Sequence, residues 1–246
     1  MNICLALAFS ASILSFASTG HAQIATTITD NGSTFTPGAS DISQLDSSGG
    51  LDNSADYSNN YTPGQSFVTG SNLLGYSLNS LTLKGSGGSG GNMANDTFTV
   101  RIESIGSNQT SLTPLATFTA AANSITNNSD FFTFDLSAAK LTLAEGTNYA
   151  FDLQSANPGD GGTYYFGLAR SGGDAYSGGE AFNEDNYNGS NIQYPKNYDR
   201  TFDLGLTSVA AVPEASTLVS LSMGVFVLAG LMLKARRRFS ADSQQN

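Results

Sequence analysis

The sequence predicts an all-β fold, an antiparallel β-sandwich of jelly-roll type, flanked by an N-terminal signal peptide and a C-terminal transmembrane helix. Three observations lead to this prediction. Short segments with alternating apolar and polar residues recur between residues 61 and 207, separated by Gly, Asn and Asp. No segment between the two ends shows helical periodicity over ten or more residues. One unbroken apolar run lies near each end of the chain.

The N-terminal apolar run covers residues 3–16 and is followed by a short polar stretch with Gly20 and Ala22. Small residues at these positions are typical of a signal-peptide cleavage site, so residues 1–22 are predicted to be removed between Ala22 and Gln23. An uncleaved N-terminal anchor is the alternative. Cleavage would remove Cys4 and His21, the only cysteine and histidine in the chain.

A mature chain without thiol or imidazole excludes several kinds of site. Ser-His-Asp and Cys-His catalysis need a histidine base, and histidine-ligated zinc needs imidazole. Disulfides are excluded too, so an exported domain must be stabilised by its own core or by bound ions.

Residues 23–60 are predicted to hold a first strand, 23–28, and then a long loop or weakly ordered arm over 30–60, where Ser, Gly, Asn and Asp dominate. The β-sandwich is predicted over 61–207, with a phase slip at Asn79 and Ser80 and a glycine-serine loop over 85–91. Its expected strands lie at 65–68, 74–78, 81–83, 97–103, 115–119, 131–136, 141–143, 149–153, 164–168 and 202–206.

The C-terminal end has three parts: a linker over 208–216 with the motif Val212, Pro213, Glu214 and Ala215, an apolar run over 217–233, and a tail over 234–246. A helix over the run would be roughly 25 Å long, which can span a bilayer if flanking side chains reach the headgroups. A basic cluster follows the run: Lys234, Arg236, Arg237 and Arg238. Positive charge on this side predicts a cytoplasmic C-terminus and an exported N-terminal domain.

This order of Pro-Glu motif, apolar helix and basic cluster resembles the PEP-CTERM sorting signal of Gram-negative bacteria. The resemblance implies processing by a membrane protease and transpeptidase, an exosortase. The usual second proline is Ala215 here, and residues 240–246 continue past the basic cluster. A plain single-pass anchor is the alternative.

The run from Leu141 to Phe151, with Gln65, Ser66 and Phe67 upstream, resembles exported β-sandwich domains called choice-of-anchor domains. The resemblance covers roughly residues 61–207 and implies a fold, but no activity.

The full chain carries a formal net charge of −10, and four of its ten basic residues belong to the C-terminal tail. The segment before the tail is therefore strongly acidic. It cannot neutralise nucleic-acid phosphates, so no nucleic-acid partner is expected.

Two ligand hypotheses concern the second half of the domain. Calcium takes carboxylate and amide oxygens from flexible loops, and its candidate ligands are Asp160, Asp174, Glu180, Glu184 and Asp185. A sugar-binding surface combines aromatic faces with amides and carboxylates, and its candidates are Tyr176, Tyr187, Tyr194 and Tyr198. The competing explanation is that Asp, Asn and Gly are the residues that turns need, and that tyrosines pack locally.

An enzyme is not expected. A glycosidase-type carboxylate pair is the one catalytic arrangement left, and it could be drawn from the many Asp residues and from Glu103, Glu145, Glu180 and Glu184. Glu103, however, is predicted on the solvent face of a strand and Glu145 in a turn. The sequence therefore predicts an exported structural or adhesive protein at the cell surface or in the extracellular matrix, without a cofactor. A tethered glycan-binding module, calcium-dependent or not, with exopolysaccharide as partner, is the alternative.

Overall fold

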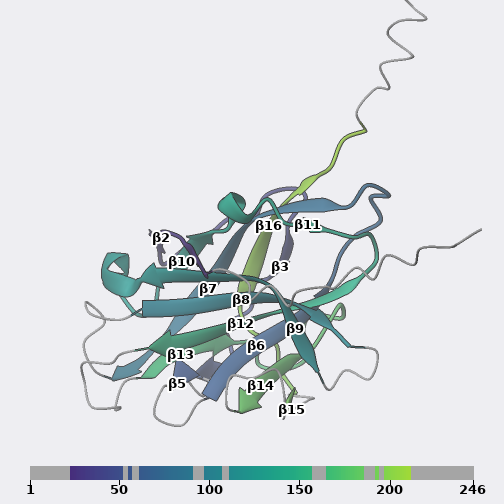
Figure 1. Ribbon diagram of the computed structural model, residues 1–246. Helices are drawn as coiled ribbons and strands as arrows, with labels where there is room; N and C mark the ends of the chain where they lie inside the picture. Colours follow the sequence, from purple (N-terminus) through teal and green to yellow (C-terminus); the bar gives the residue numbers. More distant parts are fainter. Residues whose placement is uncertain are drawn as a thin grey trace, which may run out of the picture. The chain divides into compact units, whose positions relative to one another are not determined.

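The computed structural model describes residues 23–51, 55–56, 61–90, 97–106, 111–156, 165–185, 192–193 and 197–211. The chain separates after Thr207 into two compact units, and the fold described below is that of the first. The described part is all-β, as predicted, with two short 3-10 turns, η2 (Ala122–Ser124) and η3 (Ser137–Ala139), and no α-helix (Figure 1).

The strands are β1 (Gln23–Ala25), β2 (Ile28–Gly32), β3 (Ile42–Gln44), β4 (Gly50–Leu51), β5 (Ala55–Asp56), β6 (Tyr61–Val68), β7 (Tyr76–Gly90), β8 (Thr97–Ile105), β9 (Leu112–Ala121), β10 (Phe131–Asp135), β11 (Thr142–Leu143), β12 (Asn148–Ala156), β13 (Tyr165–Arg170), β14 (Ala181–Asp185), β15 (Ile192–Gln193) and β16 (Phe202–Ser208).

These strands form two sheets. In one, β1, β9, β8, β12 and β6 are neighbours in that order, and β14 pairs with the free side of β6. In the other, β10 lies between β2 and β7, and β16 pairs with β3 and β7. The described strand pairs are antiparallel except β1 with β9, which is parallel. The jelly-roll connectivity stays a prediction.

Strand β7 belongs to both sheets. Its first part pairs with β10 and β11, and its last residues, from Gly85 to Gly90, pair with β13. The predicted phase slip is visible in the burial, because Leu78 and Leu81 are both fully buried while Asn79 and Ser80 are half-buried. The strand continues through this change of face.

The main hydrophobic core lies between the sheets, and phenylalanines dominate its centre. Phe98 lies 5.2 Å from Phe166 and 6.1 Å from Phe132, measured between ring centroids. Rings at these separations pack edge-to-face or offset and contribute beyond the area that they bury. The alternation in β8 therefore has the predicted consequence that Phe98, Val100 and Ile102 point into the core.

Three predictions about elements need correction. Residues 30–60 include most of β2 and all of β3, β4 and β5, because short strands there pair with β10, β16, β13 and β6. The glycine-serine segment from residue 85 begins as the end of β7 and not as a loop. A side chain at Gly85 would come within 2.0 Å of the Asn128 carbonyl, so glycine allows the close approach of these backbones.

The third correction concerns the outer face of β8, which was expected to face solvent. Arg101 is 5% exposed and Glu103 is fully buried.

No helix among the described residues is long and apolar enough to cross a membrane. The predicted span over 217–233, the motif at 212–215 and the basic cluster lie outside the described residues, as do Ala22 and the rest of the signal peptide.

Candidate functional site

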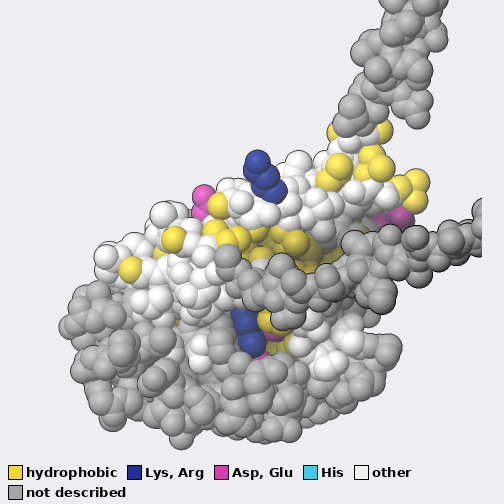
Figure 2. Space-filling model, viewed as in Figure 1, with side chains coloured by type: hydrophobic (Ala, Val, Ile, Leu, Met, Phe, Trp, Pro, Cys, Tyr) yellow, Lys and Arg dark blue, Asp and Glu magenta, His cyan; other side chains and the backbone are white. Residues whose placement is uncertain are grey.

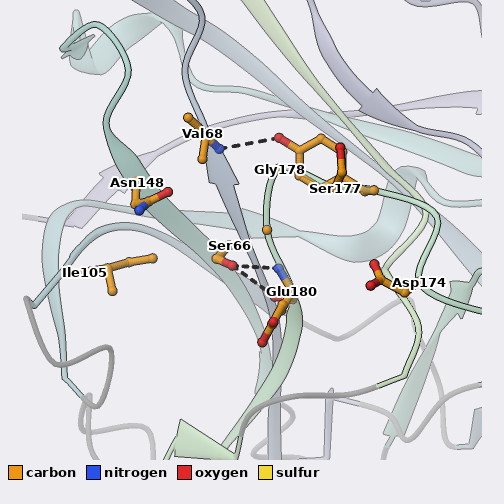
Figure 3. Close-up of a pocket in the computed structure, with 10 residues that line it drawn as sticks. Ser66, Val68, Ile105, Asn148, Asp174, Ser177, Gly178 and Glu180 are labelled. Carbon is orange, nitrogen blue, oxygen red and sulfur yellow. Dashed lines mark hydrogen bonds between the residues drawn. The ribbon is translucent and has the colours of Figure 1, made fainter.

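A polar pocket of about 300 Å³ lies between the loop over residues 171–180 and the ends of three strands (Figure 3). Ser66 and Val68 come from β6, Asn148 begins β12 and Ile105 ends β8. The loop contributes Asp174 and the run from Tyr176 to Glu180. Figure 3 shows Asn148 and Ile105 on one side and Asp174 on the other, with Ser66 and Glu180 between them.

The loop is fixed to the body of the domain by the buried carboxylate of Asp199. One of its oxygens accepts hydrogen bonds from the N–H groups of Ala175 (2.7 Å) and Tyr176 (2.8 Å). The other accepts from the Gln65 side chain at 2.9 Å. A carboxylate that receives three N–H donors holds a turn firmly, so Asp174 and Tyr176 are presented on a preorganised loop.

The other end of the loop is joined to β6 through Ser66. The Ser66 hydroxyl accepts from the Glu180 N–H at 2.8 Å, and the Ser66 N–H donates to the Glu180 carbonyl at 3.0 Å. A Cβ at Gly179 would lie 2.0 Å from the Ser66 carbonyl oxygen, so glycine permits this contact. The loop closes over the sheet edge and leaves the pocket in front of it.

Tyr176 forms the base of the loop. Its ring packs edge-on against Phe202, with centroids 5.4 Å apart, and its hydroxyl accepts from the Val68 N–H at 3.4 Å. Burial raises the pKa of this hydroxyl above its ordinary value. The ring is half-buried, so it both packs on the core and borders the pocket.

The exposed polar side chains of the pocket include Asn148, Asp174 and Glu180. No hydrogen bond ties these three side chains to another described residue, so they are available to a ligand in solution. An amide and two carboxylates beside a tyrosine ring suit the hydroxyl groups and C–H faces of a sugar.

The structure thus brings together three sequence candidates, Asp174, Tyr176 and Glu180. Tyr198 lies elsewhere, stacked under Arg170 with the guanidinium carbon 4.4 Å from its ring centroid. Asp160, Tyr187 and Tyr194 lie outside the described residues, as does the side chain of Asp185. Among the described residues no group of three or more His, Cys, Asp or Glu side chains is placed to hold a metal ion.

Glu184, a calcium candidate, belongs instead to a buried charge cluster formed by Arg101, Glu103, Asp152 and Glu184. Arg101 on β8 lies opposite Asp152 on β12, and its Nε is 3.1 and 3.0 Å from the two carboxylate oxygens. The Arg101 Nη2 also donates to Asp152 and to Glu184 on β14. Three strands of one sheet are therefore joined by a single guanidinium.

Glu103 completes the charge cluster without a hydrogen bond. Its Oε1 is 3.5 Å from the Arg101 Nε, yet neither carboxylate oxygen has a hydrogen-bond partner among the described residues. Burial and the neighbouring Asp152 carboxylate raise the pKa of Glu103 to about 9. Burial alone would lower the pKa of Arg101, but the surrounding carboxylates outweigh it and raise that pKa.

The charge cluster lies apart from this pocket. All four side chains are buried, and none of them lines the pocket. A carboxylate pair for glycoside hydrolysis must face a cleft that admits substrate. The alternation in β8 predicted that the Glu103 side chain is exposed to water. The strand pairing brings Asp152 and Glu184 to the same face, and only a knowledge of that pairing could have predicted that Glu103 is buried.

No protein-family model matches the chain, and no curated protein matches it. The solved structures that resemble it distantly include the following two. One contains the cysteine protease and lectin-like domains of Cwp84, a surface layer associated protein of Clostridium difficile, at 12% identity with a TM-score of 0.42. The other is the clostridial cysteine protease Cwp84 after propeptide cleavage, at 12% identity with a TM-score of 0.43. Each match covers 72% of this chain but only 37% and 42% of the respective structure, so the chain spans less than half the length of either.

Proposed function

We propose that this chain is an exported protein of the cell surface or extracellular matrix, with a structural or adhesive role, held first in the membrane by its C-terminal segment. The observation that carries the proposal is the order of parts after β16: a linker with Val212-Pro213-Glu214-Ala215, an apolar run and a basic cluster. The acidic, cysteine-free β-domain before it suits export, because its core needs no disulfide.

The proposal includes processing by an exosortase-type membrane protease. A plain anchor needs only apolar length and following positive charge, whereas a processing enzyme must recognise the motif itself. Proline fixes φ and removes an N–H, and Glu214 offers a carboxylate to a cationic site in the enzyme.

Replacing Pro213 and Glu214 together by alanine is expected to block processing. In the native host, mass spectrometry should find residues 217–246 absent from the wild-type protein and present in the double variant. The matched control is Ser240→Ala, beyond the basic cluster, which should be processed normally. Intact C-termini in all three proteins would leave a simple anchor as the better explanation.

A second candidate function is glycan binding at the pocket between the 171–180 loop and β6. The specific observation in its favour is the preorganised loop, which presents Asp174 and Glu180 to solvent beside the half-buried Tyr176 ring. Exopolysaccharide is the partner that an exported surface protein would meet. The ligand would contact the pocket from outside, so the buried charge cluster is not required.

The double variant Asp174→Asn, Glu180→Gln is expected to lose binding to a glycan array or to host exopolysaccharide by about tenfold or more, because each hydrogen bond to a charged group contributes roughly 1.5–3 kcal/mol. The matched control is Glu145→Gln, which neutralises a carboxylate in a turn that does not line the pocket. Equal binding by all three proteins, or none by the wild type, contradicts this function. Repeating the assay with EDTA and with added calcium decides whether binding depends on calcium.

A further inference from the structure

The turn that joins β6 to β7 exposes two leucines at its tip. Leu73 is 85% exposed and Leu74 is 48% exposed, and they are two of the three exposed large hydrophobic residues that the described chain carries. Tight turns normally place Gly, Asn, Asp, Ser or Pro at such positions, because these residues suit the backbone and water. Exposing two leucine side chains to water at the tip is unfavourable, and side chains at this position add no contacts to the core.

The turn is also held in place, so the leucines cannot fold back into the core. The Gly75 N–H donates to the Asn72 carbonyl at 2.7 Å, which closes a β-turn with Leu73 and Leu74 at its centre. The Asn72 side chain donates to the Gly75 carbonyl at 2.5 Å. Gly75 has a φ of +80°, and a Cβ there would lie 2.3 Å from the Leu143 carbonyl oxygen, so the turn conformation depends on glycine.

The sheet places this tip at the end where β16 finishes. The Asn79 side chain donates to the Thr207 hydroxyl at 2.9 Å, while the Lys84 N–H donates to the Thr201 carbonyl at 3.4 Å. Residue numbers therefore rise along β7 as they fall along β16, and the start of β7 lies beside the end of β16. In Figure 1 β16 runs toward the upper right, and in Figure 2 hydrophobic side chains gather at that end of the coloured surface.

The length of chain that follows limits how far this end can be from a membrane. Eight residues lie between Ser208 and Thr217, the first residue of the apolar run. Fully extended, they reach at most about 30 Å. An apolar tip on the membrane-proximal end of a tethered domain is placed to meet the bilayer interface, where leucine side chains are favourable.

We propose that the Leu73–Leu74 turn inserts into the interface of the membrane that anchors the chain and so gives the domain a second, reversible lipid contact. The partner is a lipid surface, and zwitterionic lipid is the better probe because the domain is acidic. The inference rests on the proposed tether, so its test must read the turn and the tether separately.

The chain offers clean labelling sites, because residues 23–246 contain no cysteine. Three single-cysteine variants would each carry an environment-sensitive fluorophore: Leu73→Cys, Ser129→Cys and Val225→Cys. Each labelled protein would be reconstituted into phosphatidylcholine vesicles that contain nitroxide-labelled lipid as the quencher. Ser129 is the matched control, since it is exposed but lies beside Gly87 at the far part of β7. Val225 lies inside the apolar run and reports the tether.

Lipid quenching is expected at positions 73 and 225 and not at 129, and the additional change Leu74→Ser should reduce it at 73 alone. Quenching at 225 without quenching at 73 overturns the inference and leaves the tether intact. A probe at 73 that is shielded from water but not quenched by lipid would show a protein contact, such as a second copy, and also overturns it. Equal quenching at positions 73 and 129 also overturns the inference, because the lipid contact would then not be specific to the turn. No quenching at 225 refutes both the tether and the inference.

Discussion

Replacing Arg101 by methionine should lower the melting temperature of the β-domain by roughly 10 °C. Arg101 is the single cation of the charge cluster, and its loss leaves Asp152 and Glu184 buried without their hydrogen-bond donor. Removing one partner of a buried ion pair typically costs about 3–5 kcal/mol, and in a domain of this size each kcal/mol corresponds to about 2–4 °C. Thermal unfolding followed by circular dichroism measures the effect.

Lys140→Met is the matched control, because Lys140 is an exposed cation at the end of η3 and its loss should change the melting temperature little. If Arg101→Met melts with the wild type, the guanidinium does not stabilise the buried carboxylates, and the charge cluster has been assigned the wrong role.

Raising the pH from about 5 to 9 should destabilise the domain, and Glu103→Gln should remove much of this dependence. In the folded domain the pKa of Glu103 is raised to about 9 from an ordinary 4.5, so between these values the folded state binds more protons than the unfolded state. The stability that Glu103 contributes is therefore fully present below pH 4.5 and is lost as pH rises toward 9, by up to about 1.4 kcal/mol per pH unit. Urea unfolding at pH 5, 7 and 9 measures the slope.

Asp203 contributes in the same direction over a narrower range, because burial and the nearby Asp41 carboxylate raise its pKa to about 7. Hydrogen bonds from Ser137 lower the pKa of Asp135, but that side chain is exposed, so it opposes the trend only weakly and only at acid pH. Asp203→Asn should therefore flatten the curve only below about pH 7, whereas Glu103→Gln should flatten it over the whole range from about pH 4.5 to 9. A wild-type protein equally stable at pH 5 and pH 9 would contradict the protonation assigned to Glu103.

The sequence was informative where one face of a strand meets the core. Alternation in β8, β10 and β12 correctly assigned Phe98, Phe132 and Phe151 to the interior, because a period of two places alternate residues on one face. The prediction from alternation was wrong for the opposite face of β8, since a polar residue in such a pattern is normally taken to be exposed to solvent. The Arg101–Asp152 contact spans 51 residues of sequence, and no local pattern encodes a pairing of that range.

The candidate site was predictable in part. The sequence singled out Asp174, Tyr176 and Glu180, which line one pocket, because Asp, Gly and Tyr mark a loop with ligand-binding chemistry. It missed Asn148 and Ser66, which reach the pocket only through the pairing of β12 with β6. It also missed β14, because its Asn-Glu-Asp sequence is typical of a turn although the strand pairs with five consecutive residues of β6.

The position of β16 between β3 and β7 determines how the domain would bear mechanical load. A pull applied at Ser208 acts along β16, parallel to the strand and across the hydrogen bonds on both of its sides. In this shear geometry the bonds share the force, whereas a strand peeled from an edge breaks them one at a time. Because β7 continues into the other sheet, tension on β16 would also be distributed through both layers. If the domain is attached through its C-terminal end, the hydrogen bonds on both sides of β16 would therefore resist a pull along the strand together.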